Sequence, residues 1–200
     1  LHLAAAGEHE LAADYAADAA AQAARNLAFD RAANLYRTAL ACRPDRWVWR
    51  KRCAEMLVLS GRSAEAAPMF MDAARGAKAA AALDLWQLAA EQYLLSGRIE
   101  QGLAVLRPLL DELGLTYPDR DRETQRRLTA ELAELTARGT AYRERSEPEL
   151  HRRDLRRADV CWAAGKGLFF VDPVRAGIFF ASGAILALEL GEPRRIARCL

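Results

Sequence analysis

Apolar and polar residues follow one another along this chain with the period of an α-helix. The run from Ala32 to Ala39 reads Ala-x-x-x-Tyr-x-x-Ala, and the run from Ala66 to Ala73 reads Ala-x-x-x-Phe-x-x-Ala. Residues four and seven positions apart lie on one face of a helix. Small residues on that face let a neighbouring helix approach closely, and the aromatic ring fills the remaining space. The pattern therefore predicts an all-α protein built from packed amphipathic helices.

Turn residues divide the pattern into segments. Gly61 and Gly97 are suited to the left-handed conformation that ends a helix. Ser63 is placed to cap the helix that follows, and Asp172 before Pro173 is a helix start signal. The helices that we expect cover residues 8–26, 29–42, 46–60, 63–77, 81–96, 99–113, 121–145, 151–171, 173–190 and 193 onward.

The segments repeat. The sequence Leu-Ser-Gly-Arg begins at Leu59 and again at Leu95, an offset of 36 residues, and the alanine–aromatic run recurs after 66 − 32 = 34 residues. A helix–turn–helix unit of about 34 residues has the period of the tetratricopeptide repeat. Stacking of such units buries the seam between neighbours.

On these residues the chain resembles tetratricopeptide-repeat (TPR) helical arrays. Trp86, Ala90 and Tyr93 match the first-helix motif, and the two alanine–aromatic runs match the second. The resemblance implies an α-solenoid of antiparallel helix pairs with a right-handed superhelix. Residues 1–118 would form TPR-like repeats, and residues 119–200 would continue the same solenoid in diverged form. We expect Trp86, Ala90 and Tyr93 to be buried against the second helix of the preceding pair, at Ala66, Phe70 and Ala73.

A second similarity covers most of the chain. Several segments look like repeat regions at the C-terminal end of large bacterial signalling proteins: Ala5–Glu8, Leu27–Ala33 with Leu35-Tyr36, Leu113–Pro118, Phe170–Val174 and Leu190–Pro193. In that family a Ser/Thr protein kinase domain and an AAA-type (STAND-like) ATPase domain precede the repeats. The resemblance implies that this chain is a fragment of a longer protein, with both catalytic parts upstream, and that it acts in signal transduction.

The composition of the chain narrows the classes of partner and cofactor that we expect. Of 200 residues, 29 are Lys or Arg and 27 are Asp or Glu, so the formal charge is +2 and no strongly basic surface for nucleic acid is expected. The four cysteines and three histidines have no metal-ligand spacing, so we expect no metal, no cofactor and reduced thiols in a cytoplasmic protein. The most apolar stretch, Gly167–Leu190, is interrupted at Asp172-Pro173 and Arg175, which leaves two pieces too short to cross a bilayer. We therefore expect no membrane partner.

Two short motifs resemble catalytic ones but are incomplete. His151-Arg-Arg-Asp-Leu155 has one arginine too many for a kinase catalytic loop, and no Asp-Phe-Gly follows it. Gly165-Lys-Gly167 lacks the first glycine and the Ser/Thr of a phosphate-binding loop. We predict that the chain is not an enzyme.

Two kinds of function remain open. The chain is either an interaction or regulatory scaffold that binds a protein, a peptide or another domain of the same chain, or a small-molecule sensor that regulates an attached ATPase or kinase. An open groove would favour the scaffold, and a closed apolar cavity within Trp162–Leu190 would favour the sensor. By motif, the groove-facing residues of the scaffold are Val48, Lys51, Arg52, Glu55, Gln87, Glu91 and Leu94.

The helices on either side of Asp172-Pro173 are apolar on most of their circumference, so neighbours must cover them on most sides. Further repeats beyond Leu200 would supply that cover. For the chain as given we expect an exposed apolar patch that drives self-association. The residues of this expected patch are Leu168, Phe169, Phe170, Ile178, Phe179, Phe180, Ile185, Leu186 and Leu188.

Overall fold

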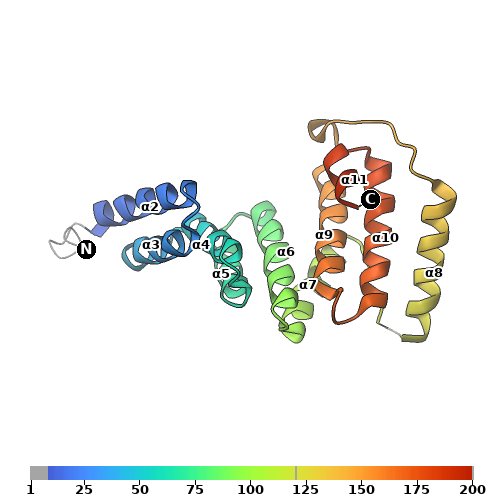
Figure 1. Cartoon of the computed structure of the whole chain (residues 1–200), viewed down its shortest axis with the longest axis horizontal. Coiled ribbons are helices and arrows are strands. Elements are labelled where there is room, and N and C mark those ends of the chain that lie inside the picture. The colour runs from blue at the N-terminus through green and yellow to red at the C-terminus, as the bar shows by residue number, and fades with distance from the viewer. Residues whose placement is uncertain (1–8, 120, 200) are drawn as a thin grey trace. The chain divides into compact units, whose positions relative to one another are not determined.

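The computed structural model of the chain describes residues 9–119 and 121–199, with only the backbone of Asp121 and Arg122, and every regular element in these ranges is a helix (Figure 1). The predicted all-α class is confirmed over the described residues. The apolar start of the chain, Leu1–Ala6, and the first residue of the helix expected at 8–26 lie outside them. The helices form two compact units, Leu1–Arg98 and Ile99–Leu200. The repeat pattern in the sequence changes later, after residue 118.

The first unit is a serial stack of helices. It contains α2 (His9–Arg25), α3 (Phe29–Cys42), α4 (Trp47–Leu59), α5 (Ser63–Gly76) and α6 (Ala79–Leu95). Each helix packs against the next one along the chain. The turns between them follow the sequence signals, because Gly61 and Gly97 both have a φ of +77°. The prediction that Ser63 caps α5 is wrong, because its hydroxyl donates to Oε1 of Gln92 at 2.8 Å instead.

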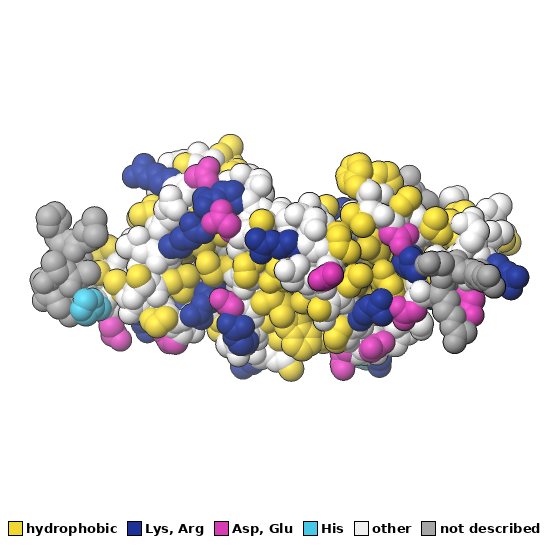
Figure 2. Space-filling view, turned by 90° about the horizontal axis from the view of Figure 1, so that it is seen from below, with side chains coloured by type: hydrophobic (Ala, Val, Ile, Leu, Met, Phe, Trp, Pro, Cys, Tyr) yellow, Lys and Arg dark blue, Asp and Glu magenta, His cyan; other side chains and the backbone are white. Residues whose placement is uncertain are grey.

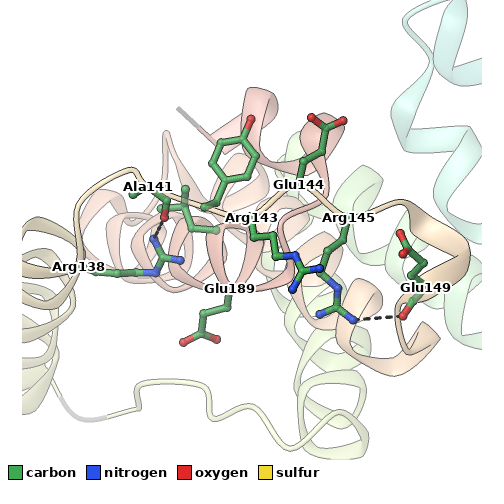
Figure 3. Close-up of a pocket in the computed structure, with 9 residues that line it drawn as sticks. Arg138, Ala141, Arg143, Glu144, Arg145, Glu149 and Glu189 are labelled. Carbon is green, nitrogen blue, oxygen red and sulfur yellow. Dashed lines mark hydrogen bonds between the residues drawn. The ribbon is translucent and has the colours of Figure 1, made fainter.

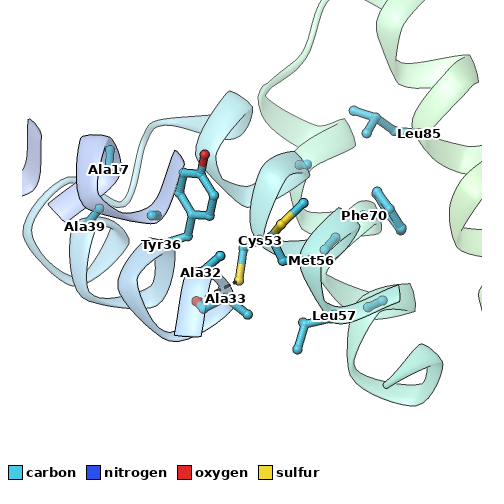
Figure 4. Packing of buried hydrophobic residues seen from close by; sticks show 14 of the residues in the cluster. Ala17, Ala32, Ala33, Tyr36, Ala39, Cys53, Met56, Leu57, Phe70 and Leu85 are labelled. Carbon is cyan, nitrogen blue, oxygen red and sulfur yellow. Dashed lines mark hydrogen bonds between the residues drawn. The ribbon is translucent and has the colours of Figure 1, made fainter. Parts of the chain in front are cut away.

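Small residues form most of the core of this unit (Figure 4). Ala32, Ala33 and Ala39 of α3 are fully buried, and Tyr36 lies among them. The thiol of Cys53 on α4 donates to the carbonyl oxygen of Ala33 at 3.4 Å, and burial raises the pKa of this thiol. Close approach of α3 and α4 therefore depends on side chains no larger than alanine at the contact.

The predicted register of α6 is only partly right. Ala90 is buried, as expected, but Trp86 and Tyr93 are half-buried. The alanines of α6 in the buried cluster with Ala66, Phe70 and Ala73 are Ala82 and Ala89, and Trp86 and Tyr93 pack against this cluster while partly buried.

An ion-pair cluster lies on the surface of the first unit. Arg62 donates to both carboxylate oxygens of Glu65 at 2.7 and 2.8 Å, and Arg37 donates to Oε2 of Glu65 at 2.7 Å. These two hydrogen-bonded guanidinium groups lower the pKa of Glu65 from 4.5 to about 2. The ionised form of Glu65 is therefore the one that the folded state favours.

This shift predicts an acid-sensitive contribution to stability. Because the folded-state pKa of Glu65 is depressed, its contribution is present above pH 4.5 and is lost as the pH falls towards 2. The loss is expected to be below about 1 kcal/mol, since the pair is exposed. Urea unfolding between these pH values measures it. The Glu65→Gln variant should lose the part of this pH dependence that Glu65 contributes, and Glu10→Gln on the exposed surface of α2 should keep it.

The second unit is arranged around one helix. It contains α7 (Ile99–Glu112), α8 (Asp121–Arg138), the 3-10 turn η1 (Glu147–Glu149), α9 (Arg152–Leu168), α10 (Pro173–Leu190) and α11 (Pro193–Cys199). Helix α10 lies between α9 and α8, and α11 packs against both α10 and α9 (Figure 1). Asp172 caps α10 as predicted, accepting a hydrogen bond from the backbone N–H of Arg175 at 3.0 Å.

These neighbours cover most of the apolar circumference of α10. Its Ile178, Phe179, Ile185 and Leu188 are buried, while Phe180 is half-buried against the ring of Trp162 at 5.4 Å. Within the described residues, α10 is the one helix long and apolar enough to cross a membrane by length and composition, and half of that window is buried inside the protein. Of the nine residues of the expected patch, only Phe169 and Phe170 are exposed.

The helix predicted at 121–145 is shorter than expected. It ends at Arg138, because Gly139 adopts a φ of +67°. Residues 140–146 have no regular structure and cross the C-terminal end of α10, where the N–H of Arg145 donates to the carbonyl oxygen of Gly191 at 2.9 Å. We call residues 140–146 the strap. The helix predicted at 151–171 also ends early, at Leu168.

Candidate functional site

Two adjoining depressions lie between α4 and α6 of the first unit and share Arg52. The larger has a volume of about 430 Å³ and the smaller of about 170 Å³. We call them together the α4–α6 groove. Its apolar lining consists of Trp47, Val48, Met56, Val58, Leu59, Phe70, Ala81, Leu85 and Leu88, and its polar lining of Lys51, Arg52, Asp84, Glu55, Glu91 and Gln92.

Helical spacing places these side chains together. Val48, Lys51 and Glu55 stand three or four positions apart, so they share one face of α4. Asp84, Leu88 and Glu91 share one face of α6 in the same way. The opposite face of α4 carries residues such as Cys53 and Leu57, which are fully buried in the core. The core therefore fixes the orientation of both groove walls.

The charged groups of the groove are paired along α4. The ammonium of Lys51 lies 2.7 Å from Oε1 of Glu55, and Nη1 of Arg52 donates to Oε2 of Glu55 at 3.1 Å. One carboxylate is thus held by two cations. Apolar surface remains open beside these pairs, since Leu59 is 57% exposed and Val48 is 47% exposed. An apolar strip flanked by charged side chains is suited to bind an amphipathic segment.

Five of the seven residues predicted by motif line this groove: Val48, Lys51, Arg52, Glu55 and Glu91. Leu94 is not available to a partner, because it is only 2% exposed. Gln87 is half-buried and is not part of the lining of either depression. The prediction missed the apolar strip of Val58, Leu59 and Leu88, although Leu59 and Leu88 stand four positions after Glu55 and Asp84.

The second unit has a larger depression, beside the strap (Figure 3). Its volume is about 630 Å³, and its walls are mainly polar. Arg143 and Arg145 point to the same side of the strap, and Glu144 points to the opposite side. Arg138 donates to the carbonyl oxygen of Ala141 at 3.1 Å. The remaining lining residues are Tyr142, Glu149, Leu188 and Glu189.

This depression differs from the cavity that a small-molecule sensor would require. The segment Trp162–Leu190, where sequence analysis placed such a cavity, contributes only Leu188 and Glu189 to it. Its lining contains three arginines and three glutamates, and it opens to solvent. Its chemistry is that of a hydrated, charge-balanced surface.

The residues of the incomplete catalytic motifs lie outside the α4–α6 groove and outside the depression beside the strap. His151 is exposed just before α9, and Asp154 lies 3.8 Å from Arg157 in an intrahelical ion pair. Cys161 is fully buried, and burial raises the pKa of its thiol to about 12, so the thiol is protonated near neutral pH. Across residues 9–119 and 121–199, no group of three or more His, Cys, Asp or Glu side chains is arranged to hold a metal ion.

The chain matches no protein-family model, no curated protein and no solved structure at a significant level of similarity. The arguments for its function therefore come from its own residues.

Proposed function

We propose that this chain is a non-catalytic helical-repeat scaffold that binds a protein or peptide segment in the α4–α6 groove. The observation that carries the proposal is the apolar strip of Val58, Leu59 and Leu88 flanked by Lys51, Arg52, Glu55 and Glu91. We also propose that the helix pairs form a TPR-like, right-handed α-solenoid. In this proposal the scaffold serves a larger bacterial signalling protein with kinase and ATPase domains.

The shape and chemistry of the groove support a peptide more than a small molecule. Ligand cavities for small molecules are concave and enclose most of the ligand surface. The α4–α6 groove is open along the length of two helices, and its exposed leucine lies at one end. A segment that presents apolar side chains at helical spacing would contact the strip and leave its polar face in water.

Peptide display tests the proposal. A library of random peptides of about 15 residues, long enough for three to four helical turns, is selected against the folded chain. We expect enriched peptides with apolar residues three or four positions apart. Leu59→Glu should weaken the binding of these peptides at least about tenfold, because it places a charge in the apolar strip without disturbing the core.

The control variant is Leu95→Glu. Leu95 occupies the same position in the repeated Leu-Ser-Gly-Arg turn and is 46% exposed, but it is not part of the groove. Its peptide affinity should equal that of the unmodified chain. Equal binding by the Leu59→Glu chain, or enrichment of no peptide, would refute the groove as a peptide site.

A further inference from the structure

The turn between α9 and α10 exposes consecutive apolar side chains. Phe169 is 53% exposed, Phe170 is 88% exposed and Val171 is 52% exposed. We call these three residues the aromatic tip. Figure 2 looks at the molecule from the side on which α9 and α10 are joined, and hydrophobic side chains lie at the surface there. Single exposed apolar residues are common, whereas a contiguous apolar group is often part of an interaction site.

The aromatic tip is held in place by its own unit. The rings of Phe169 and Phe170 meet edge to face at 5.0 Å, and Phe169 lies 6.4 Å from the ring of Phe180. The N–H of Val171 donates to the carbonyl oxygen of Leu168 at 2.9 Å. The side chains are therefore presented on a rigid turn, which lowers the entropy cost of binding.

The charges around the aromatic tip favour a protein partner over an anionic membrane. Arg175 is bonded to Asp172, and the ammonium of Lys166 lies over the ring of Trp162 at 5.8 Å. These surroundings hold two basic side chains beside one carboxylate, whereas attraction to anionic lipid needs a basic cluster. A partner surface that is apolar and contains carboxylates would fit better.

We propose that the aromatic tip of one chain docks in the α4–α6 groove of a second copy of the chain. This inference rests on the groove described under the proposed function. The groove offers the matching surface, since Val58, Leu59 and Leu88 are apolar and its volume is about 430 Å³. Glu91 at its edge is opposite in charge to Lys166 beside the tip, which favours this orientation of the two chains.

The two surfaces differ, so the contact is heterologous. Each chain has one tip and one groove, so contacts of this kind either close, as a reciprocal dimer or a ring, or continue as an open chain of copies. The aromatic tip buries about 300–400 Å² on its side, given about 150–250 Å² for a whole aromatic side chain. That is less than the roughly 800 Å² per partner of a stable interface. The association is therefore weak and depends on concentration.

Sedimentation velocity over about a hundredfold range of concentration tests the inference. The unmodified chain should increase in average mass with concentration, to that of a dimer or beyond it. Phe170→Ser and Leu59→Glu should each raise the dissociation constant at least about tenfold. Tyr15→Ser, which removes a 61% exposed aromatic side chain from α2, and Leu95→Glu should behave like the unmodified chain.

Mixing the two variants gives the decisive result. The Phe170→Ser chain keeps its groove and the Leu59→Glu chain keeps its tip, so an equimolar mixture should form a one-to-one dimer and nothing larger. Self-association that is lost in Phe170→Ser but kept in Leu59→Glu would show a tip-to-tip contact and overturn the inference. So would a chain that stays monomeric and sediments with phosphatidylserine vesicles through Phe170.

Peptide display separates this inference from the proposed function. Selected peptides that bind the groove of a strictly monomeric chain would leave the proposed function intact and refute only the docking of the aromatic tip. If the unmodified chain neither binds any selected peptide nor self-associates, both the proposed function and the docking of the aromatic tip are refuted.

Discussion

Replacing Phe70 by alanine is expected to destabilise the first unit by about 3–5 kcal/mol, the range measured for deletion of a buried phenylalanine ring. Phe70 is 1% exposed and belongs to the same buried cluster as Leu57 of α4 and Leu85 of α6 (Figure 4). Most residues of this cluster are alanines, which have no rotamers with which to fill a void, so Leu57 and Leu85 can fill only part of it. Much of the cavity therefore stays open, and urea unfolding of the variant should show a loss in this range.

The matched control is Phe170→Ala, which makes the same chemical change at a side chain that is 88% exposed. Its free energy of unfolding should lie within about 0.5 kcal/mol of that of the unmodified chain. A loss for Phe70→Ala that is no larger than this would mean that the alanine-lined core of the first unit is loosely packed. Since Phe70 also lines the α4–α6 groove, peptide binding is best measured on the surface variants instead.

The helices of the first unit could be predicted because local signals and tertiary packing agree there. The alanine–aromatic spacing of α3 and α5 faces the core, and both predicted turn glycines have a φ of +77°. In the second unit, Asp172 caps α10 as predicted, because its partner, the N–H of Arg175, lies in the same turn. Ser63 is the exception, because a side chain from α6, Gln92, competes for its hydroxyl. Sequence within one turn cannot reveal a partner that lies 29 residues away.

The second unit was harder to predict because its neighbours are not adjacent in sequence. Helix α8 packs against α10, which comes two helices later, and covers Gly177 with the side chain of Leu128. The apolar circumference of α10 predicts an exposed patch, but the helices around it bury most of that surface. The polar sequence of 139–145 predicts a continued helix, and Gly139 is the local signal that the helix ends before it.

The groove could be predicted in part. Motif positions located Val48, Lys51, Arg52, Glu55 and Glu91, since helical spacing fixes which residues share a face. Motif alone could not show that Leu94 is buried, because burial depends on how other parts of the chain pack. It also gave no sign of Leu59, which looks like an ordinary helix-end residue and differs from Leu95 only by its tertiary surroundings.

The second large effect is expected at Gly191, where the strap crosses the end of α10. Gly191 has a φ of +75°, and its N–H donates to the carbonyl oxygen of Ala187 at 2.9 Å. A Cβ atom at this position would overlap the carbonyl oxygen of Arg143. The neighbour is backbone, so it cannot move aside by a change of rotamer. The strap would have to shift, and the hydrogen bond from Arg145 to Gly191 would be lost.

The Gly191→Ala variant should therefore lose about 2–3 kcal/mol of stability, with about 1–2 kcal/mol from the left-handed backbone and about 1 kcal/mol from the lost hydrogen bond. Gly139→Ala is the matched control, because Gly139 has a φ of +67° but open space around its Cβ position, so only the backbone cost applies. Urea unfolding measures the difference between the two. Limited proteolysis with trypsin tests whether the strap is displaced. A displaced strap should be cut faster at the exposed Arg143 and Arg145, so cleavage should be faster in Gly191→Ala than in Gly139→Ala. Equal stability and equal cleavage of the two variants would show that the strap does not lie against Gly191.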